Sequence, residues 1–125
     1  MKKVFLLSAV TFLAACTPVS TGVIILQSPT PNAVVTSPLV VKGEAPGTWF
    51  FEANLPIKLL DDQGAELAIV GAQATEDWMT TDMVSFEGTL TFTTNRPKGT
   101  LVIMNDNPSG EPANAKQESF SVKFQ

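Results

Sequence analysis

The chain has 125 residues, with twelve acidic and eight basic side chains, a formal net charge of −4, one cysteine and no histidine. The acidic balance argues against nucleic-acid binding, which rewards clustered Lys and Arg. A single cysteine excludes an internal disulfide, and the lack of histidine excludes Ser-His and Cys-His nucleophiles.

The first fifteen residues have the pattern of a secretory signal. Lys2 and Lys3 precede an apolar run of about a dozen residues, too short for a membrane-spanning helix, which needs about 20. The run ends in Leu13-Ala14-Ala15-Cys16, which resembles the lipobox of bacterial lipoproteins over all four positions. In that family the thiol receives a diacylglycerol, the signal is cut before the cysteine, and the new N-terminus is usually acylated as well.

The resemblance predicts a cleaved signal at 1–15, a lipidated Cys16 with a short tether at 16–22, and one domain at 23–125. Stable anchoring needs more than one acyl chain, which a di- or triacylated Cys16 supplies. These acyl groups are the only cofactor we expect, and the membrane is the first partner. The protein is then an extracytoplasmic, membrane-anchored lipoprotein. Thr17 follows the anchor in place of an inner-membrane retention aspartate, so the outer membrane is favoured in a host with two membranes.

Period-two alternation predicts strands along the rest of the chain. Residues 49–59 carry polar Glu52, Asn54 and Lys58 at even positions, and Pro56 indicates an edge strand or a bulge. A turn at 61–64 should follow. The odd positions, predicted to face the core, are Trp49, Phe51, Ala53, Leu55, Ile57 and Leu59.

Two further stretches alternate as clearly. Residues 84–92 place Val84, Phe86, Leu90 and Phe92 on one face, and the C-terminus does the same with the apolar residues of 120–124. Less regular strands are expected at 23–27, 34–35, 39–43, 67–70 and 101–104. Seven or eight short strands with no helical segment describe an all-β sandwich. Because the inter-sheet disulfide common in such folds is missing, Trp49 and the phenylalanines should fill the core.

Six segments in order resemble the immunoglobulin-like domain of bacterial spore germination, the Gmad2 family. They are PNAVVTSPLVVKGEA at 31–45, GTWFFEA at 47–53, L-x-D-x-x-G at 59–64, DWMT at 77–80, FEG at 86–88 and NDNPSG at 105–110. The resemblance implies an Ig-like sandwich of about seven strands and no enzymatic activity. It implies a binding or structural role in the envelope, in spore germination or envelope assembly, with an unknown envelope protein or glycan as partner.

The alternative function is a small carbohydrate-active or wall-hydrolysing lipoprotein. The acidic pairs Asp61-Asp62 and Glu76-Asp77 are the candidate acid and base. Adjacent strand residues point to opposite faces, however, so neither pair converges on a substrate, and turn formation explains both. A carbohydrate site on a sandwich would show aromatic side chains on an outer face, whereas the aromatic residues here mostly alternate with polar ones, and there is no tyrosine. We therefore predict no catalytic residue.

Asn105, Asp106 and Asn107 form a second candidate, a loop site. The spacing of 105–110 matches the start of an EF-hand, but the leading carboxylates are missing and the twelfth position is Lys116 in place of a bidentate Glu. We predict no metal site, with looser calcium coordination through Asp106 and Glu111 left open. The competing interpretation is a tight inter-strand loop in which Gly110 takes a positive φ.

Asp77, Trp78, Met79 and Thr80 are the candidate contact surface. They lie between two predicted strands, where a tryptophan has no obligatory core position, and Trp and Met are frequent interface anchors. The competing interpretation is that Trp78 folds back and caps one end of the sandwich.

Overall fold

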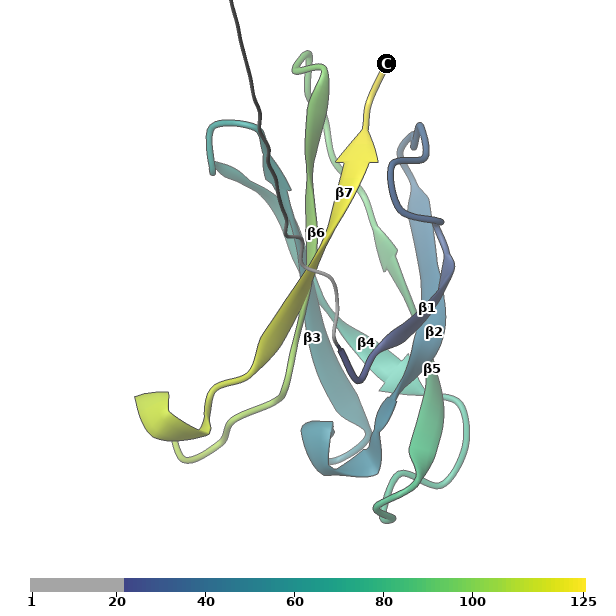
Figure 1. The fold of residues 1–125 in the computed structure, drawn as a ribbon, viewed down its shortest axis with the longest axis vertical. Coiled ribbons are helices and arrows are strands. Elements are labelled where there is room, and N and C mark those ends of the chain that lie inside the picture. Colours follow the sequence, from purple (N-terminus) through teal and green to yellow (C-terminus); the bar gives the residue numbers. More distant parts are fainter. Residues whose placement is uncertain (1–21) are drawn as a thin grey trace, which may run out of the picture.

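The computed structural model describes residues 22–125. The described chain is all-β, and its helical content consists of two short 3₁₀ turns, η1 and η2 (Figure 1). The elements in order are β1 (Ile25–Ser28), β2 (Leu39–Pro46), η1 (Gly47–Trp49), β3 (Asn54–Asp61), β4 (Glu66–Ala74), β5 (Met83–Leu90), β6 (Lys98–Met104), η2 (Pro112–Asn114) and β7 (Gln117–Lys123). No helix among these residues is long and apolar enough to cross a membrane.

The strands form one antiparallel sheet in the order β1-β2-β5-β4-β3-β6-β7. Strand β4 pairs with β3 over most of its length but with β5 only through Gln73 and Ala74. The sheet therefore folds over at β4, with β1, β2 and β5 on one side and β3, β6 and β7 on the other (Figure 1). This neighbour order is that of an immunoglobulin constant domain, A-B-E-D followed by C-F-G. The predicted Ig-like sandwich of seven strands is confirmed.

The edge strand β7 is covered by the segment that follows β1. Val35 N donates to Lys123 O at 2.8 Å, and Lys123 N donates to Ala33 O at 2.9 Å. The strand expected at 34–35 is thus a single parallel bridge between Val34 and Lys123. Covering β7 in this way protects an edge that could otherwise pair with another chain.

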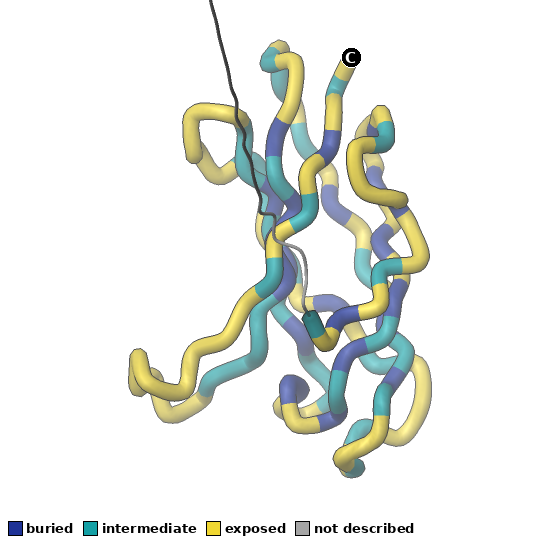
Figure 2. The backbone as a smooth tube through the Cα atoms, in the orientation of Figure 1, coloured by how far each residue is buried: buried dark blue, intermediate teal, exposed yellow. Residues whose placement is uncertain are grey.

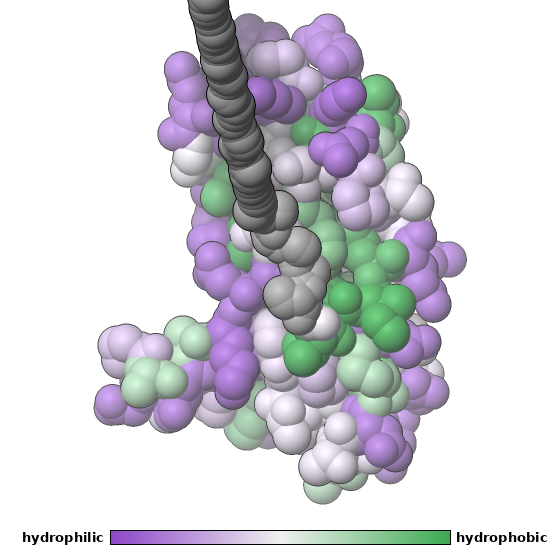
Figure 3. Space-filling model, in the orientation of Figure 1, coloured by the Kyte–Doolittle hydropathy of each residue, from purple (hydrophilic) through white to green (hydrophobic). Residues whose placement is uncertain are grey.

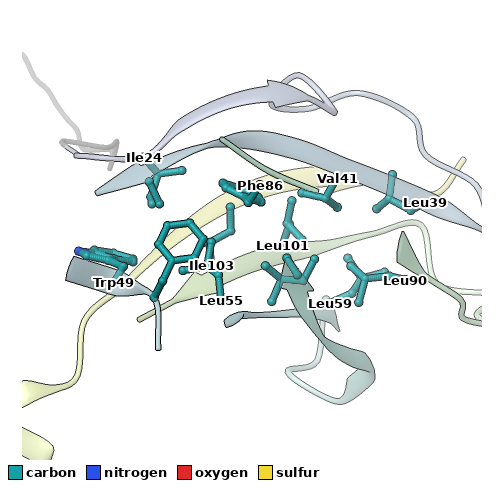
Figure 4. Close-up of a cluster of buried hydrophobic side chains, with 14 of the residues drawn as sticks. Ile24, Leu39, Val41, Trp49, Leu55, Leu59, Phe86, Leu90, Leu101 and Ile103 are labelled. Atoms are coloured by element: carbon teal, nitrogen blue, oxygen red, sulfur yellow. The ribbon is translucent and has the colours of Figure 1, made fainter. Parts of the chain in front are cut away.

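The core lies between the two layers, as the dark segments of Figure 2 show. Trp49 is only 6% exposed, so its predicted core position is confirmed. In Figure 4, Trp49 and Ile24 lie toward one end of the cluster, and Leu39 and Leu90 toward the other. Burying each large apolar side chain contributes about 1.5–3 kcal/mol. The completely buried members include Val41, Leu55, Ile57, Leu59, Phe86, Leu90, Leu101 and Ile103.

The alternation predicted for residues 49–59 is wrong at its start. Phe51 is 42% exposed, whereas its neighbour Phe50 is buried. The 3₁₀ turn η1 and the positive φ angles of Glu52 (51°) and Ala53 (66°) interrupt the extended backbone. Since period-two alternation requires a continuous strand, the inward order holds only from Leu55, after β3 begins.

Pro56 does not mark an edge strand, because β3 pairs with β4 on one side and β6 on the other. Its pairing with β6 begins only at Ile57. At Pro56 the strand is therefore paired on one side alone, and the missing N–H costs no ladder hydrogen bond to β6.

The other two alternating stretches agree with the prediction. Val84, Phe86 and Leu90 are buried, and Val122 is buried between half-buried Phe120 and Phe124. Strand β5 ends at Leu90, and Phe92 lies beyond it with its ring centroid 5.5 Å from that of Phe124.

Candidate functional site

Three loops gather at one end of the sandwich, the lower end in Figure 1. They connect β2 to β3 (47–53), β4 to β5 (75–82) and β6 to β7 (105–116). We call this surface the loop end, and the opposite end, with the β3–β4 and β5–β6 connections, the turn end. Both sequence candidates, Asp77–Thr80 and Asn105–Asn107, fall on the loop end.

The turn η1 links the three loops. Gly47 N donates to Asp82 O at 2.9 Å, which ties η1 to the β4–β5 loop, and Asp106 N donates to Trp49 O at 2.8 Å, which ties it to the β6–β7 loop. A side chain at Gly47 would collide with the carbonyl oxygens of Thr80 and Trp78. The loops are therefore packed backbone against backbone, which only glycine permits here.

Residues 77–80 form a hydrogen-bonded turn in which the neighbouring side chains of Trp78 and Met79 differ in exposure. Asp77 Oδ1 accepts from Met79 N at 3.0 Å, and Thr80 Oγ1 accepts from Asp82 N at 3.1 Å. Trp78 is half-buried and packs on the core cluster, whereas Met79 is 75% exposed. The two interpretations considered for Trp78 were a cap on the sandwich and an exposed contact. The geometry of a cap is found at Trp78, which lies over the core, and the geometry of an exposed contact is found at its neighbour Met79.

The polar side chains of 105–107 are engaged within the fold. Asn105 Oδ1 accepts from Lys116 N at 2.8 Å, and Asn107 Nδ2 donates to Glu111 O at 2.8 Å. Asp106 Oδ2 accepts from Asn54 Nδ2 at 3.0 Å. Gly110 has a φ of 71°, as predicted. This geometry fits the tight-loop interpretation, although the loop runs to residue 116 and contains η2.

The family model for the immunoglobulin-like domain of bacterial spore germination, Gmad2, matches residues 23–111, well over half of the chain. The chain belongs to this family. The match begins just before β1 and ends inside the β6–β7 loop, so it includes the loop end as far as Glu111. No curated protein and no solved structure matches the chain.

The acidic pairs of this Gmad2 domain stabilise turns. Asp61 Oδ1 accepts from Gln63 N and Ala65 N at 2.8 and 2.9 Å at the turn end. Asp62 forms a two-point ion pair with Arg96, Nε to Oδ1 at 2.7 Å and Nη2 to Oδ2 at 2.9 Å. The Arg96 guanidinium lowers the pKa of Asp62 through these bonds, and Asp62 raises the pKa of Arg96. Asp61 therefore holds backbone amides and Asp62 holds a cation, and the two carboxylates do not form a pair that faces a substrate.

The second acidic pair of the Gmad2 domain lies on the loop end. Glu76, Asp77 and Asp82 line a hollow of about 370 Å³. Glu76 Oε2 accepts from Ser85 N at 2.8 Å, and the Asp77 carboxylate is held by Met79 N. Within residues 22–125, no group of three or more His, Cys, Asp or Glu side chains has an arrangement that could hold a metal ion.

Exposed large apolar side chains occur at several places on the Gmad2 domain, among them Val34, Val40 and Ile69, and two groups of them bear on function. Phe51 and Met79 lie on the loop end. Val23 and Ile25, each about half exposed, lie at the start of the described chain, where Figure 3 shows green surface over β1. Phe51 was predicted to face the core, although the preceding Pro46-Gly47 was a signal that the strand alternation breaks there. The predicted lipid site, Cys16, lies outside the described residues.

Proposed function

We propose that the protein is a lipid-anchored, extracytoplasmic Ig-like binding module of the bacterial envelope. In this proposal its loop end contacts an envelope protein or glycan, and the protein acts by binding and support and not by catalysis. The observation that carries the proposal is Met79, which is 75% exposed on a loop that is tied to the core at Trp78.

Exposure of Met79 is informative because the loop beneath it is fixed. Binding through a flexible loop loses conformational entropy as the loop becomes ordered, whereas binding through a preorganised loop avoids most of this loss. Asp77 caps the turn through Met79 N, and Gly47 N holds Asp82 O. Methionine and aromatic side chains are enriched at interfaces, and Phe51 is exposed on the same end. Loops at one end of the sandwich also form the binding surface of immunoglobulin variable domains.

The anchor is proposed from the lipobox at Cys16. Val23 is seven positions after Cys16, and a fully extended chain spans at most about 3.5 Å per residue, so the domain begins within about 25 Å of the acylated residue. Exposed Val23 and Ile25 would then lie close to the bilayer. The family description supports spore germination as one setting for this role, and envelope assembly is the other.

Photo-cross-linking in cells tests the binding surface. A photo-reactive residue replaces Met79 in the full chain, and the adducts are identified by mass spectrometry. The control places the same residue at Gln63, which is exposed at the turn end. A discrete protein or glycan adduct from position 79 and not from 63 supports the proposal, and equal or absent adducts from both positions would overturn it.

The anchor needs a separate test. Cys16→Ser should abolish incorporation of a labelled fatty acid and release the protein from the membrane fraction. A Thr17→Ser variant changes the neighbouring residue and should keep both. Retention of the label in Cys16→Ser would contradict the proposed anchor without touching the loop-end proposal.

A further inference from the structure

A hollow of about 440 Å³ lies at the turn end, on the outer face of β6 and β7. It extends from the segment that covers β7 to the β3–β4 turn. Its polar lining is Asn32, Asp62, Lys98, Thr100, Ser121 and Lys123. None of these residues belongs to the loop end, so the hollow is a separate feature of the surface.

The register of β6 and β7 places like charges opposite each other in this hollow. Lys98 pairs with Lys123, and two positions along the strand Thr100 pairs with Ser121. The intervening pair, Gly99 and Val122, is buried, so the lysines and the hydroxyl side chains share the outward face. Directly opposed side chains on such a ladder have Cβ atoms about 4.5–5.5 Å apart, and like charges there are destabilising.

The one carboxylate in the lining, that of Asp62, is already paired with Arg96. Asp62 lines the hollow, but both of its oxygens accept from Arg96, at 2.7 and 2.9 Å. In residues 22–125, Arg96–Asp62 is the one ion pair within 4.0 Å, although Lys98 contributes slightly to the lowered pKa of Asp62. Lys98 and Lys123 are two of the six basic residues that follow the predicted signal. The lining of this hollow therefore brings two lysines together in an otherwise acidic chain.

We propose that this hollow binds a phosphate group. The lysine ammonium groups act as compact point charges of the kind that binds phosphate, and the neighbouring Arg96 is already occupied by Asp62. The Thr100 and Ser121 hydroxyls and the Asn32 amide supply neutral donors on the same face. A bound phosphate would also reduce the electrostatic repulsion between Lys98 and Lys123, so the two opposed charges would favour binding.

Two-dimensional ¹H–¹⁵N NMR of the full chain in non-ionic detergent tests the proposal, with inorganic phosphate as the probe. Saturable amide shifts are expected at residues 98–100 and 121–123. Replacing Lys98 and Lys123 together by Gln should weaken binding at least about tenfold, given the Coulomb term of two charges at contact distance. Lys42→Gln is the matched control, because Lys42 faces Glu87 across β2 and β5, and it should leave the affinity unchanged.

Further arms identify the source of the phosphate. Glucose 6-phosphate tests a phosphorylated sugar, and vesicles of phosphatidylcholine with 20% phosphatidylglycerol, about one lipid in five, test a lipid headgroup. Stronger shifts with one arm than with inorganic phosphate assign the natural source. Shifts that sodium chloride reproduces at equal ionic strength, or an unchanged affinity in the double variant, would overturn the site.

Discussion

Asn54 donates a hydrogen bond from Nδ2 to Asp106 Oδ2 at 3.0 Å, joining the first residue of β3 to the β6–β7 loop across 52 positions of sequence. Asp106 also donates its backbone N–H to Trp49 O at 2.8 Å. A residue selected as a candidate ligand therefore fixes the loop against η1 and β3. The same contacts determine how the loop end presents Met79 and Phe51, because all three loops meet at η1.

Asp106→Ala should destabilise the domain. It removes a charged acceptor and leaves the Asn54 amide without this partner, which costs about 1–2 kcal/mol. Thermal unfolding followed by circular dichroism should then show a Tm lower by about 5 °C for a domain of this size. Glu111→Ala removes a carboxylate from the same loop whose side chain makes no contact of this kind, and it should leave Tm within about 1 °C. Equal Tm values for the two variants would show that the Asn54–Asp106 bond is not structural.

Gly47→Ala should separate the β2–β3 loop from the β4–β5 loop. The added Cβ would meet the carbonyl oxygens of Thr80 and Trp78, which cannot rotate away as a side chain can. We expect a loss of about 1–3 kcal/mol, the range for overpacked sites. Faster hydrogen exchange at the amides of Gly47 and Met79 should accompany it. Thr48→Ala, at the exposed neighbour, should change neither quantity, and a stable Gly47→Ala with unaltered exchange would contradict the packing described for this end.

The strands were predictable where local pattern decides the structure. In β5 and β7 the chain is continuously extended, so the order of Val84, Phe86 and Val122 in sequence gives their faces directly. Phe51 was misplaced because η1 and two residues at positive φ interrupt the pattern, and a short 3₁₀ turn leaves little periodic signal. The gathering of three loops at one end depends on strand order and on single bonds such as Gly47 N to Asp82 O, which sequence periodicity does not encode.

The pairing of Lys98 with Lys123 could not be predicted from the sequence either. The two residues are 25 positions apart, and their opposition follows only from the register of β6 and β7. A shift of one residue would turn every side chain of the strand to the other face. The composition shows only an acidic chain, and the two lysines come together only once the strands are paired.

Arg96→Gln should raise the pKa of Asp62. In the wild-type protein the Arg96 hydrogen bonds lower that pKa, so the pair contributes stability above the ordinary Asp pKa of about 3.9, and the contribution is lost as the pH falls through the lower folded value. A ¹³C carboxyl NMR titration should show the Asp62 midpoint moving upward in the variant. Gln63→Ala, in the same turn, should leave it in place. An Asp62 midpoint that does not move in Arg96→Gln would contradict the assigned cause of the shift.

Lys98→Gln should stabilise the phosphate-free protein at low ionic strength. Lys98 and Lys123 are directly opposed on the β6–β7 ladder, and relieving such a like-charge pair is worth about 0.2–1 kcal/mol. The gain should disappear near 1 M salt, where the Debye length falls to about 3 Å. Lys42→Gln should instead lower the stability, because Lys42 lies directly opposite Glu87 and its loss removes an attraction. Denaturant unfolding at two salt concentrations measures both variants, and a stability loss in Lys98→Gln equal to that in Lys42→Gln would show that the two lysines do not repel each other.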